Sequence, residues 1–142
     1  MTVESAQKLH DVIRKRFSDE FGDEYLIAYD NAPFNQPDDE MWIRWSVLSG
    51  NTIKADIGGS TGRYRHNGVA VAQIFSVLEK GTRDGLILAD RIVAKFLATS
   101  DTTSVANNSV VFRTPSITHV GRTGSQWWQI NVSCPYFADE IS

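Results

Sequence analysis

Cysteine is nearly missing from this chain, which has only Cys134 among its 142 residues. A single cysteine excludes an internal disulfide and a zinc site built from several cysteines, and it fits a reducing, cytosolic environment. Long hydrophobic runs are missing too, because the longest fall far short of the roughly 18 residues that suggest a membrane span. The opening segment MTVESAQKLHD also lacks the apolar core of a signal peptide. We therefore expect no association with a membrane.

Neither sign of charge is in large excess. The sequence holds 14 lysines and arginines against 17 aspartates and glutamates, which gives a net charge of −3. This balance gives no support to nucleic-acid binding through phosphate neutralisation, which needs basic side chains. The apolar content is ordinary, and a chain of this length can bury enough surface for a core without disulfides or metal. We expect one domain over residues 1–142.

Motifs that carry a known chemistry are also missing. The three histidines, His10, His66 and His119, are scattered, whereas a metal site needs converging ligands. The glycines of residues 58–62 lack the lysine and the spacing of a phosphate-binding loop. Cys134 stands in a strand pattern without an evident activating base, so we interpret it as a small buried group. The sequence therefore predicts no catalytic residue, no metal ion and no cofactor.

The pattern of apolar residues predicts two helices and several strands. Residues 3–21 carry apolar side chains at helical spacing, and Gly22 suits the end of this helix. Thr82 is a candidate cap for a second helix over residues 83–98, whose broad apolar stripe can touch both a sheet and the first helix. Strands are predicted over residues 25–29, 41–49, 69–79, 109–113, 116–122 and 127–134. This order predicts an α+β fold, a mainly antiparallel mixed β-sheet with two α-helices packed on one face.

Residues 50–68 differ from the segments on both sides, because they contain five glycines separated mostly by polar residues. We interpret this segment as a long β-hairpin arm that is mobile in the single chain. Arg63, Tyr64 and Arg65 lie on its return side. An arm of this kind is expected to become ordered when it meets a neighbouring subunit or another partner.

The segment from Tyr29 to Trp45, YDNAPFNQPDDEMWIRW, is the most informative part of the chain. Its two prolines, Pro33 and Pro37, fix their own φ and push the preceding residue out of the helical region, so the loop is stiff although irregular. Phe34 stands between the prolines and is interpreted as an apolar anchor. Three carboxylates then stand directly before an aromatic strand, and these are Asp38, Asp39 and Glu40.

These three carboxylates have two interpretations. They could form the acid–base pair of a hydrolase, which requires carboxylates in different environments. They could also form a solvated acidic edge, which as a functional site would contact a basic patch on a partner or a neighbouring subunit. A second candidate surface lies on the sheet at Trp42, Arg44 and Trp127, because aromatic and arginine side chains are enriched in tight interfaces.

A succession of segments runs through nearly the whole chain, from about residue 3 to residue 137. After the first helix come YDNAPF at Tyr29–Phe34, WIR at Trp42–Arg44, the glycine-rich segment, FRTPS at Phe112–Ser116, and WWQINV at Trp127–Val132. This succession resembles the tail-terminator proteins of long-tailed phages and prophages. The resemblance rests on the order of the segments, since no single motif among them is unique.

The resemblance implies a protein that is not an enzyme and that forms a hexameric ring at the head-proximal end of the tail tube. Such a ring stops tube growth and offers a surface for head attachment. The implied partners are further copies of the chain, the major tail tube protein and a head-completion or connector protein, while DNA passes through the ring without sequence-specific binding. The implied location is the tail of the virion, after assembly in the bacterial host cytoplasm. On this interpretation the interface residues are Asp38, Asp39, Glu40, Trp42, Arg44, Arg63, Tyr64, Arg65 and Trp127.

Two other functions stay open. Another head–tail connector or tail-completion adaptor would share the logic of assembly and differ in its partner. A small enzyme or ligand-binding domain without a cofactor would instead need a pocket in which His66, Asp56 or the acidic triplet converge.

Overall fold

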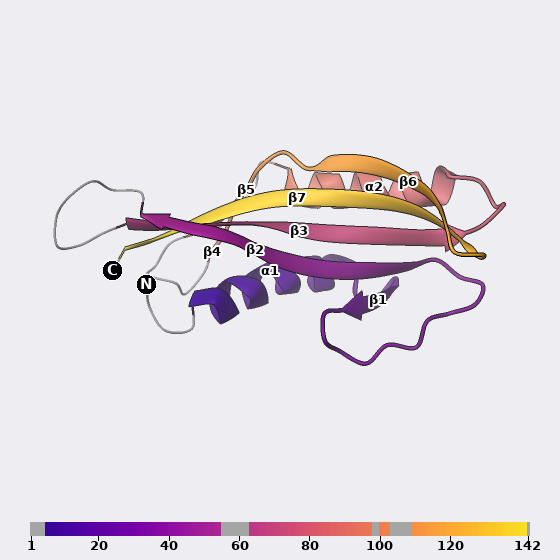
Figure 1. The fold of residues 1–142 in the computed structure, drawn as a ribbon, viewed down its shortest axis with the longest axis horizontal. Helices are drawn as coiled ribbons and strands as arrows, with labels where there is room; N and C mark the ends of the chain where they lie inside the picture. Colours follow the sequence, from indigo (N-terminus) through magenta and orange to yellow (C-terminus); the bar gives the residue numbers. More distant parts are fainter. Residues whose placement is uncertain (1–4, 55–62, 98–99, 103–108, 142) are drawn as a thin grey trace.

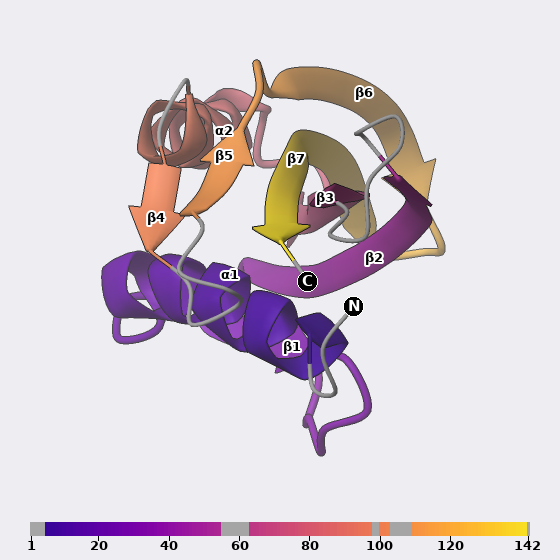
Figure 2. The same cartoon turned by 90° about the vertical axis from the view of Figure 1, so that its left-hand side faces the viewer.

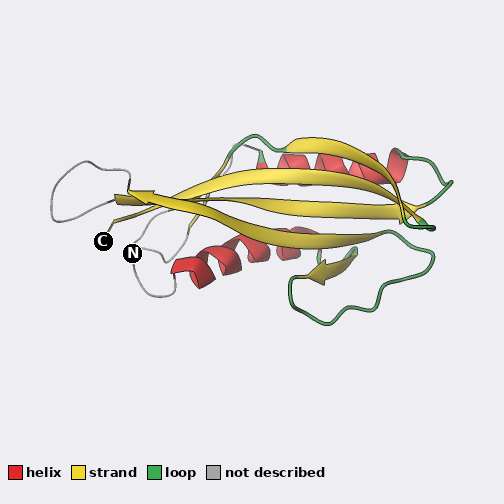
Figure 3. Ribbon diagram, in the orientation of Figure 1, coloured by secondary structure: helices red, strands yellow, loops and turns green. Residues whose placement is uncertain are grey.

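The computed structural model of this chain describes residues 5–54, 63–97, 100–102 and 109–141. Their elements follow in the order α1 Ser5–Phe21, β1 Leu26–Tyr29, β2 Trp42–Lys54, β3 Arg63–Val77, α2 Arg83–Phe96, β4 Ser100–Thr102, β5 Ser109–Phe112, β6 Ser116–Thr123 and β7 Trp127–Ile141. The long strands run along the long axis of the molecule (Figures 1 and 3). The predicted α+β class is confirmed.

Seven strands of the described chain form one sheet in the order β1-β2-β3-β7-β5-β4, and β6 also pairs with β7. β6 lies beside the first half of β7 and β5 lies beside its second half. All pairs are antiparallel except β1 with β2, which makes the sheet mixed and mainly antiparallel. The loop of residues 30–41 allows this one parallel pair, because a parallel connection needs a crossover of about a dozen residues.

The main core lies between one face of the sheet and the two helices. Ile43, Ile74 and Ile130 form a fully buried row across β2, β3 and β7. In the next row Trp45 stacks on Phe17 of α1, with 4.0 Å between the ring centroids. Burying an isoleucine contributes about 1.5–3 kcal/mol, and an aromatic pair adds about 0.5–1.5 kcal/mol. Figure 2 shows the sheet end-on, with α1 below it and α2 to its left.

A second and smaller core forms on the opposite face of the sheet. Strand residues of odd number in β3 and β7 point to this face, where Trp42 stacks on Phe75 at 4.3 Å and meets Trp127 edge-on at 6.1 Å. Ala28 of β1 belongs to the same cluster. Phe34 packs against Trp42, with 5.2 Å between the ring centroids, and thereby joins the 30–41 loop to the sheet. Phe34 is therefore the apolar anchor that the sequence predicts.

The long hairpin arm predicted for residues 50–68 is not confirmed. β2 continues to Lys54 and β3 already begins at Arg63, so both flanks of the segment are strands of the sheet. β3 pairs there with β2 on one side and with β7 on the other, as far as Arg63 and Ile141. The segment between the two strands, residues 55–62, lies outside the described residues. The flanks are strands despite their glycines. β3 has partners on both sides, and the β2 flank pairs with β3, so the backbone groups that face these partners are satisfied.

β7 is longer than the sequence predicts, since it does not end at Cys134 but passes through Pro135 to Ile141. Proline has no backbone N–H, and within a sheet it is tolerated only where that group is not needed. The carbonyl of Pro135 accepts a hydrogen bond from the backbone N–H of Arg113 at 2.8 Å, on the side of β5 and β6. The missing N–H faces this same side, where β7 changes its neighbour from β6 to β5. The ladder with β3 is therefore unbroken.

The helix boundaries follow the predicted signals in part. The backbone N–H of Gly22 donates to the carbonyl of Ser18 at 2.8 Å, which closes α1 at the predicted residue. Thr82 precedes α2 as predicted, although its side chain makes no capping hydrogen bond. Among the described residues, no helix combines the length and the apolar character needed to cross a bilayer.

Candidate assembly surfaces

The predicted acidic edge lies in the loop that connects the parallel strands β1 and β2. Asp38, Asp39 and Glu40 are all exposed. Among the described residues, no lysine or arginine lies within salt-bridge distance of any of the three carboxylates. Two contacts hold the loop in place, the packing of Phe34 on the sheet and a hydrogen bond of 2.9 Å from the Ser46 hydroxyl to the Asp30 carboxylate. A fixed loop therefore presents three carboxylates to solvent.

The two tryptophans of the predicted interface point to the predicted face, but their rings are covered. Trp42 is 2% exposed and Trp127 is 6% exposed. The two rings pack against each other, Trp42 also packs against Phe75 and Phe34, and both tryptophans belong to the second core. In this conformation both rings serve the second core. Their role in contacts between subunits stays a prediction.

Arg44 lies on the same face and is exposed. Its guanidinium carbon lies 5.5 Å from the Trp42 ring and 5.6 Å from the Phe75 ring, so the cation covers the outer side of the second core. A cation over an aromatic ring is stabilised by about 0.5–1 kcal/mol at an exposed site. Of the three residues predicted for this surface, Arg44 is the one whose side chain is available to a partner.

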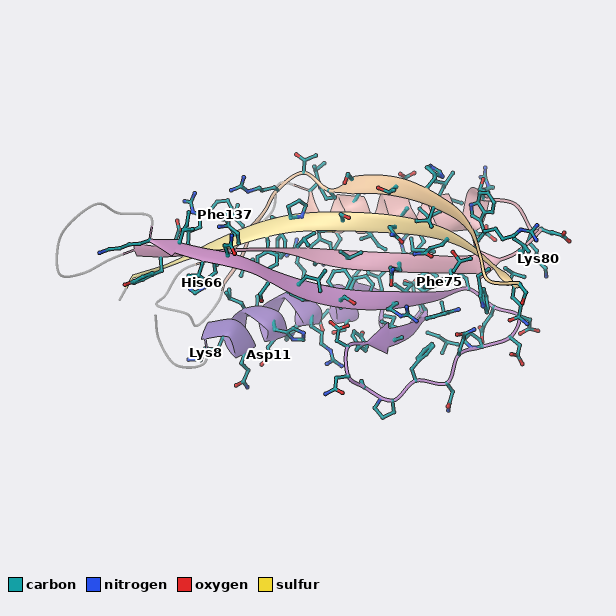
Figure 4. The ribbon with its side chains drawn as sticks, in the orientation of Figure 1. Lys8, Asp11, His66, Phe75, Lys80 and Phe137 are labelled. Carbon is teal, nitrogen blue, oxygen red and sulfur yellow. The ribbon has the colours of Figure 1, made fainter. Side chains whose placement is uncertain are left out.

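A third surface lies near the other end of the sheet, where Figure 4 labels Phe137. Sequence reasoning predicted Arg65 as part of an interface but missed its neighbours Arg113, Phe137 and Asp139. Two guanidinium groups flank this ring, with the Arg65 carbon at 4.5 Å and the Arg113 carbon at 4.8 Å from its centroid. Arg65 also donates two hydrogen bonds to Asp139, of 2.8 and 2.9 Å. We call Arg65, Arg113, Phe137 and Asp139 the arginine–phenylalanine patch. Along β7, the buried residues Tyr136 and Ala138 alternate with Phe137 and Asp139. This alternation indicates a strand that continues beyond Cys134, but Pro135 is a signal for a strand end, so the patch was not predicted.

The remaining predicted interface residues lie at the same end of the sheet. Tyr64 is half-buried and pairs in register with Lys54 of β2. The backbone of Arg63 opens β3, while its side chain lies outside the described part of the structure. Arg65 is not the free cation that the sequence suggests, because Asp139 neutralises it, and this contact raises the pKa of Arg65.

Several stretches of strand have a backbone edge without a neighbouring strand within the described chain, and two of them are long. β1 covers β2 only from Trp42 to Trp45, so the edge of β2 after Trp45 is open, and β6 pairs only with β7. Leu48 and Ile53 on this part of β2 are 52% and 51% exposed. Open edges are templates for pairing with another chain. Both edges are therefore available for assembly.

Of the groups named for the enzyme alternative, the two that the structure describes, His66 and the acidic triplet, do not come together. His66 is buried, and its Nδ1 lies 3.2 Å from the Thr52 hydroxyl, beside a hollow of about 80 Å³. His66 lies nine positions before Phe75 along β3, and Phe75 is the neighbour of Trp42. Nine positions correspond to about 30 Å at the usual rise of a strand. The acidic triplet stands directly before Trp42, so it does not converge with His66. Asp56 lies outside the described residues.

Cys134 is fully buried in the main core, as predicted. Burial raises the pKa of its thiol to about 12, so the reactive thiolate is not formed near neutral pH.

A hollow of about 250 Å³ beside the turn after β3 is lined by Leu78, Glu79, Gly81, Thr82, Arg122 and Trp128. Within the described parts of the chain, no group of three His, Cys, Asp or Glu residues is arranged to hold a metal ion.

The described residues form an α+β fold whose most distinctive features are its exposed charges and its open sheet edges. A family model described as phage tail terminator protein matches residues 8–136. The chain belongs to this family of structural components of phage tails. A solved structure is 23% identical to this chain and superimposes with a TM-score of 0.64, over 91% of this chain and 94% of the other. That likeness concerns the fold alone. No curated protein matches the sequence.

Proposed function

We propose that this protein forms a ring, most simply a hexamer, on the head-proximal end of the phage tail tube. The ring stops the polymerisation of the tube and presents the surface to which the head-completion or connector protein attaches. The observation that carries the proposal is the family match over residues 8–136, which covers nearly the whole described domain. DNA passes through the ring without sequence-specific contacts.

The surfaces of the domain support a ring in physical terms. A closed ring of identical subunits needs a heterologous contact, in which two different patches of the same chain meet. The acidic loop, the open edges and the arginine–phenylalanine patch are different in chemistry and lie on different elements. The chain therefore carries the unlike surfaces that a rotational assembly requires, as well as further surface for the tube and the connector.

Tail tubes assembled from the major tail protein test the proposal. Electron micrographs of tubes grown with and without this protein would measure tube length, and light scattering after size exclusion would measure the mass of the free protein. We expect tubes of limited length with a ring at one end. Tubes that elongate without limit in its presence would contradict termination, and binding to a connector but not to tubes would assign the protein to the tail-completion adaptors.

A further inference from the structure

The arginine–phenylalanine patch carries a positive group that the described chain does not neutralise. Arg65 shares Asp139 in a pair of charge-assisted hydrogen bonds. Arg113 also lies over the Phe137 ring, with its guanidinium carbon 4.8 Å from the ring centroid, and no carboxylate of the described residues lies within salt-bridge distance of it. Its side chain is exposed at the end of β5. The patch therefore presents one unpaired guanidinium, held in place by an aromatic ring, next to an ion pair.

The Phe137 side chain prepares the Arg113 guanidinium for binding. An arginine that lies against an aromatic ring has fewer conformations to lose when its planar group of N–H donors binds a partner than a freely moving side chain has. The natural partner of such a fork is a carboxylate, which accepts two parallel hydrogen bonds. The patch is thus suited to an acidic segment.

The same chain supplies an acidic segment of matching character. Asp38, Asp39 and Glu40 are exposed, unpaired among the described residues, and fixed by the anchor Phe34. A segment that is already ordered binds without the entropic cost of folding on its partner. The acidic loop and Arg113 therefore have complementary charges, and an aromatic contact restrains each of them.

The two surfaces cannot satisfy each other within one molecule. The acidic loop precedes Trp42, which lies beside Phe75 and Gln129 in the sheet. Phe137 lies eight positions after Gln129 along β7, or about 26 Å at the usual rise of a strand. Figure 4 accordingly shows Phe75 and Phe137 toward opposite ends of the sheet. Complementary patches at two ends of one chain produce head-to-tail contact between copies.

We infer that the acidic loop Asp38–Glu40 of one copy docks on the arginine–phenylalanine patch of the next copy, with Arg113 as the central contact. This inference rests on the proposed ring, for which it names the contact between neighbouring subunits. Arg44 stays outside this contact and is available to the tube or the connector.

Charge reversal on each side tests the contact. Arg113→Glu places a carboxylate where the loop would dock, and the triple variant Asp38→Lys, Asp39→Lys, Glu40→Lys reverses the loop. Because like charges facing each other in an interface are strongly unfavourable, we expect each variant to reduce ring formation on tail tubes at least about tenfold. Arg83→Glu, an equal change of charge at the start of α2, is the matched control and should assemble normally. Circular dichroism and thermal unfolding should show that all variants remain folded.

The decisive sample combines both reversals in one chain. Its lysine loop faces a glutamate on the neighbouring copy, so we expect ring formation to return. An equal mixture of the two reversed chains should also assemble, because each loop then finds a complementary patch on the other chain.

The outcomes separate the contact from the proposed function. A wild-type chain that forms no ring would overturn the proposed function itself. If the wild type and both reversed variants form normal rings, the proposed function stands and the contact is overturned. The contact is also overturned if the wild type forms rings but the combined variant stays unassembled.

Discussion

Trp42 shows how one side chain acquires its role from its neighbours. The alternation of β2 directs its indole away from the helices, which suggested a ring offered to a partner. The structure places Phe75 on one side of this ring and Phe34 at its margin, and Arg44 lies above it. The aromatic surface is thus satisfied within the chain, and the exposed charge of Arg44 remains. At this scale, burial decides which residues are available to a partner.

Cys134 gives the first prediction, because its burial makes the thiol inert. The pKa of about 12 and the closed packing around it should leave the folded protein unlabelled by iodoacetamide or an aromatic disulfide reagent near pH 8. Mass spectrometry should find one labelled thiol per chain after unfolding in guanidinium, which is the positive control. Complete labelling of the native protein within minutes would show that the core around β7 opens.

At the scale of elements, an ion pair joins α2 to the turn between α1 and β1. Arg91 donates hydrogen bonds of 2.7 and 3.1 Å to the two carboxylate oxygens of Glu24 and another of 3.2 Å to the Tyr25 hydroxyl. Its guanidinium carbon also lies 5.1 Å from the centre of the Phe21 ring. A second contact joins the two helices directly. The Arg16 side chain of α1 donates a hydrogen bond of 2.7 Å to the backbone carbonyl of Lys95, near the end of α2. These contacts fix the helices to each other at their exposed side.

The Glu24 contact makes stability depend on pH. The hydrogen bond from Arg91, followed by its charge, holds the pKa of Glu24 below the ordinary value of 4.5. A lowered pKa in the folded state stabilises the fold above the ordinary value, and this contribution is lost as pH falls through the lowered pKa. Glu24→Gln should therefore unfold at lower urea concentration than the wild type near pH 7, and the difference should narrow near pH 3. Asp23→Asn is the neighbouring control, and an equal pH-dependent difference in that variant would contradict the assignment.

The 30–41 loop is a second element whose position depends on one contact. Phe34→Ala removes a half-buried ring from Trp42 and should cost about 1–2 kcal/mol, below the 3–5 kcal/mol of a fully buried phenylalanine. We expect faster proteolysis within the loop and weaker ring assembly, although no charge has changed. Urea unfolding and timed digestion measure the two effects, with Asn35→Ala as the control. Undisturbed assembly with a loosened loop would mean that the rigidity of the acidic segment does not matter.

At the scale of the whole molecule, assembly should depend on salt. Exposed charges are screened within about 10 Å at 0.1 M ionic strength and more closely at higher salt. Ring formation through the acidic loop and Arg113 should therefore weaken between about 0.1 and 0.5 M sodium chloride. The Arg113→Gln variant should form rings more weakly than the wild type at low salt, and its ring formation should change less as the salt concentration rises. Sedimentation at several salt concentrations measures this, and rings that become more stable with salt would indicate an apolar contact through the open strand edges.

The sequence by itself determined the parts of this protein that depend on local spacing. The apolar stripe of α1, the end of that helix at Gly22, the start of α2 after Thr82 and the alternation of β2 all follow from neighbouring residues, and so does the anchoring role of Phe34. The order of segments also sufficed to place the chain in its family.

The tertiary structure alone decided where β7 ends and what the flanks of the glycine-rich segment form. Pro135 and the glycines are local signals against a strand, yet β3 and β7 continue because each has a partner that satisfies its backbone. The same continuation places Arg113 beside Phe137, two residues that are distant in the chain. Spacing along a chain indicates which way a side chain points. The neighbours that cover or neutralise that side chain come from other strands, and they are determined only when the strands pair into the sheet.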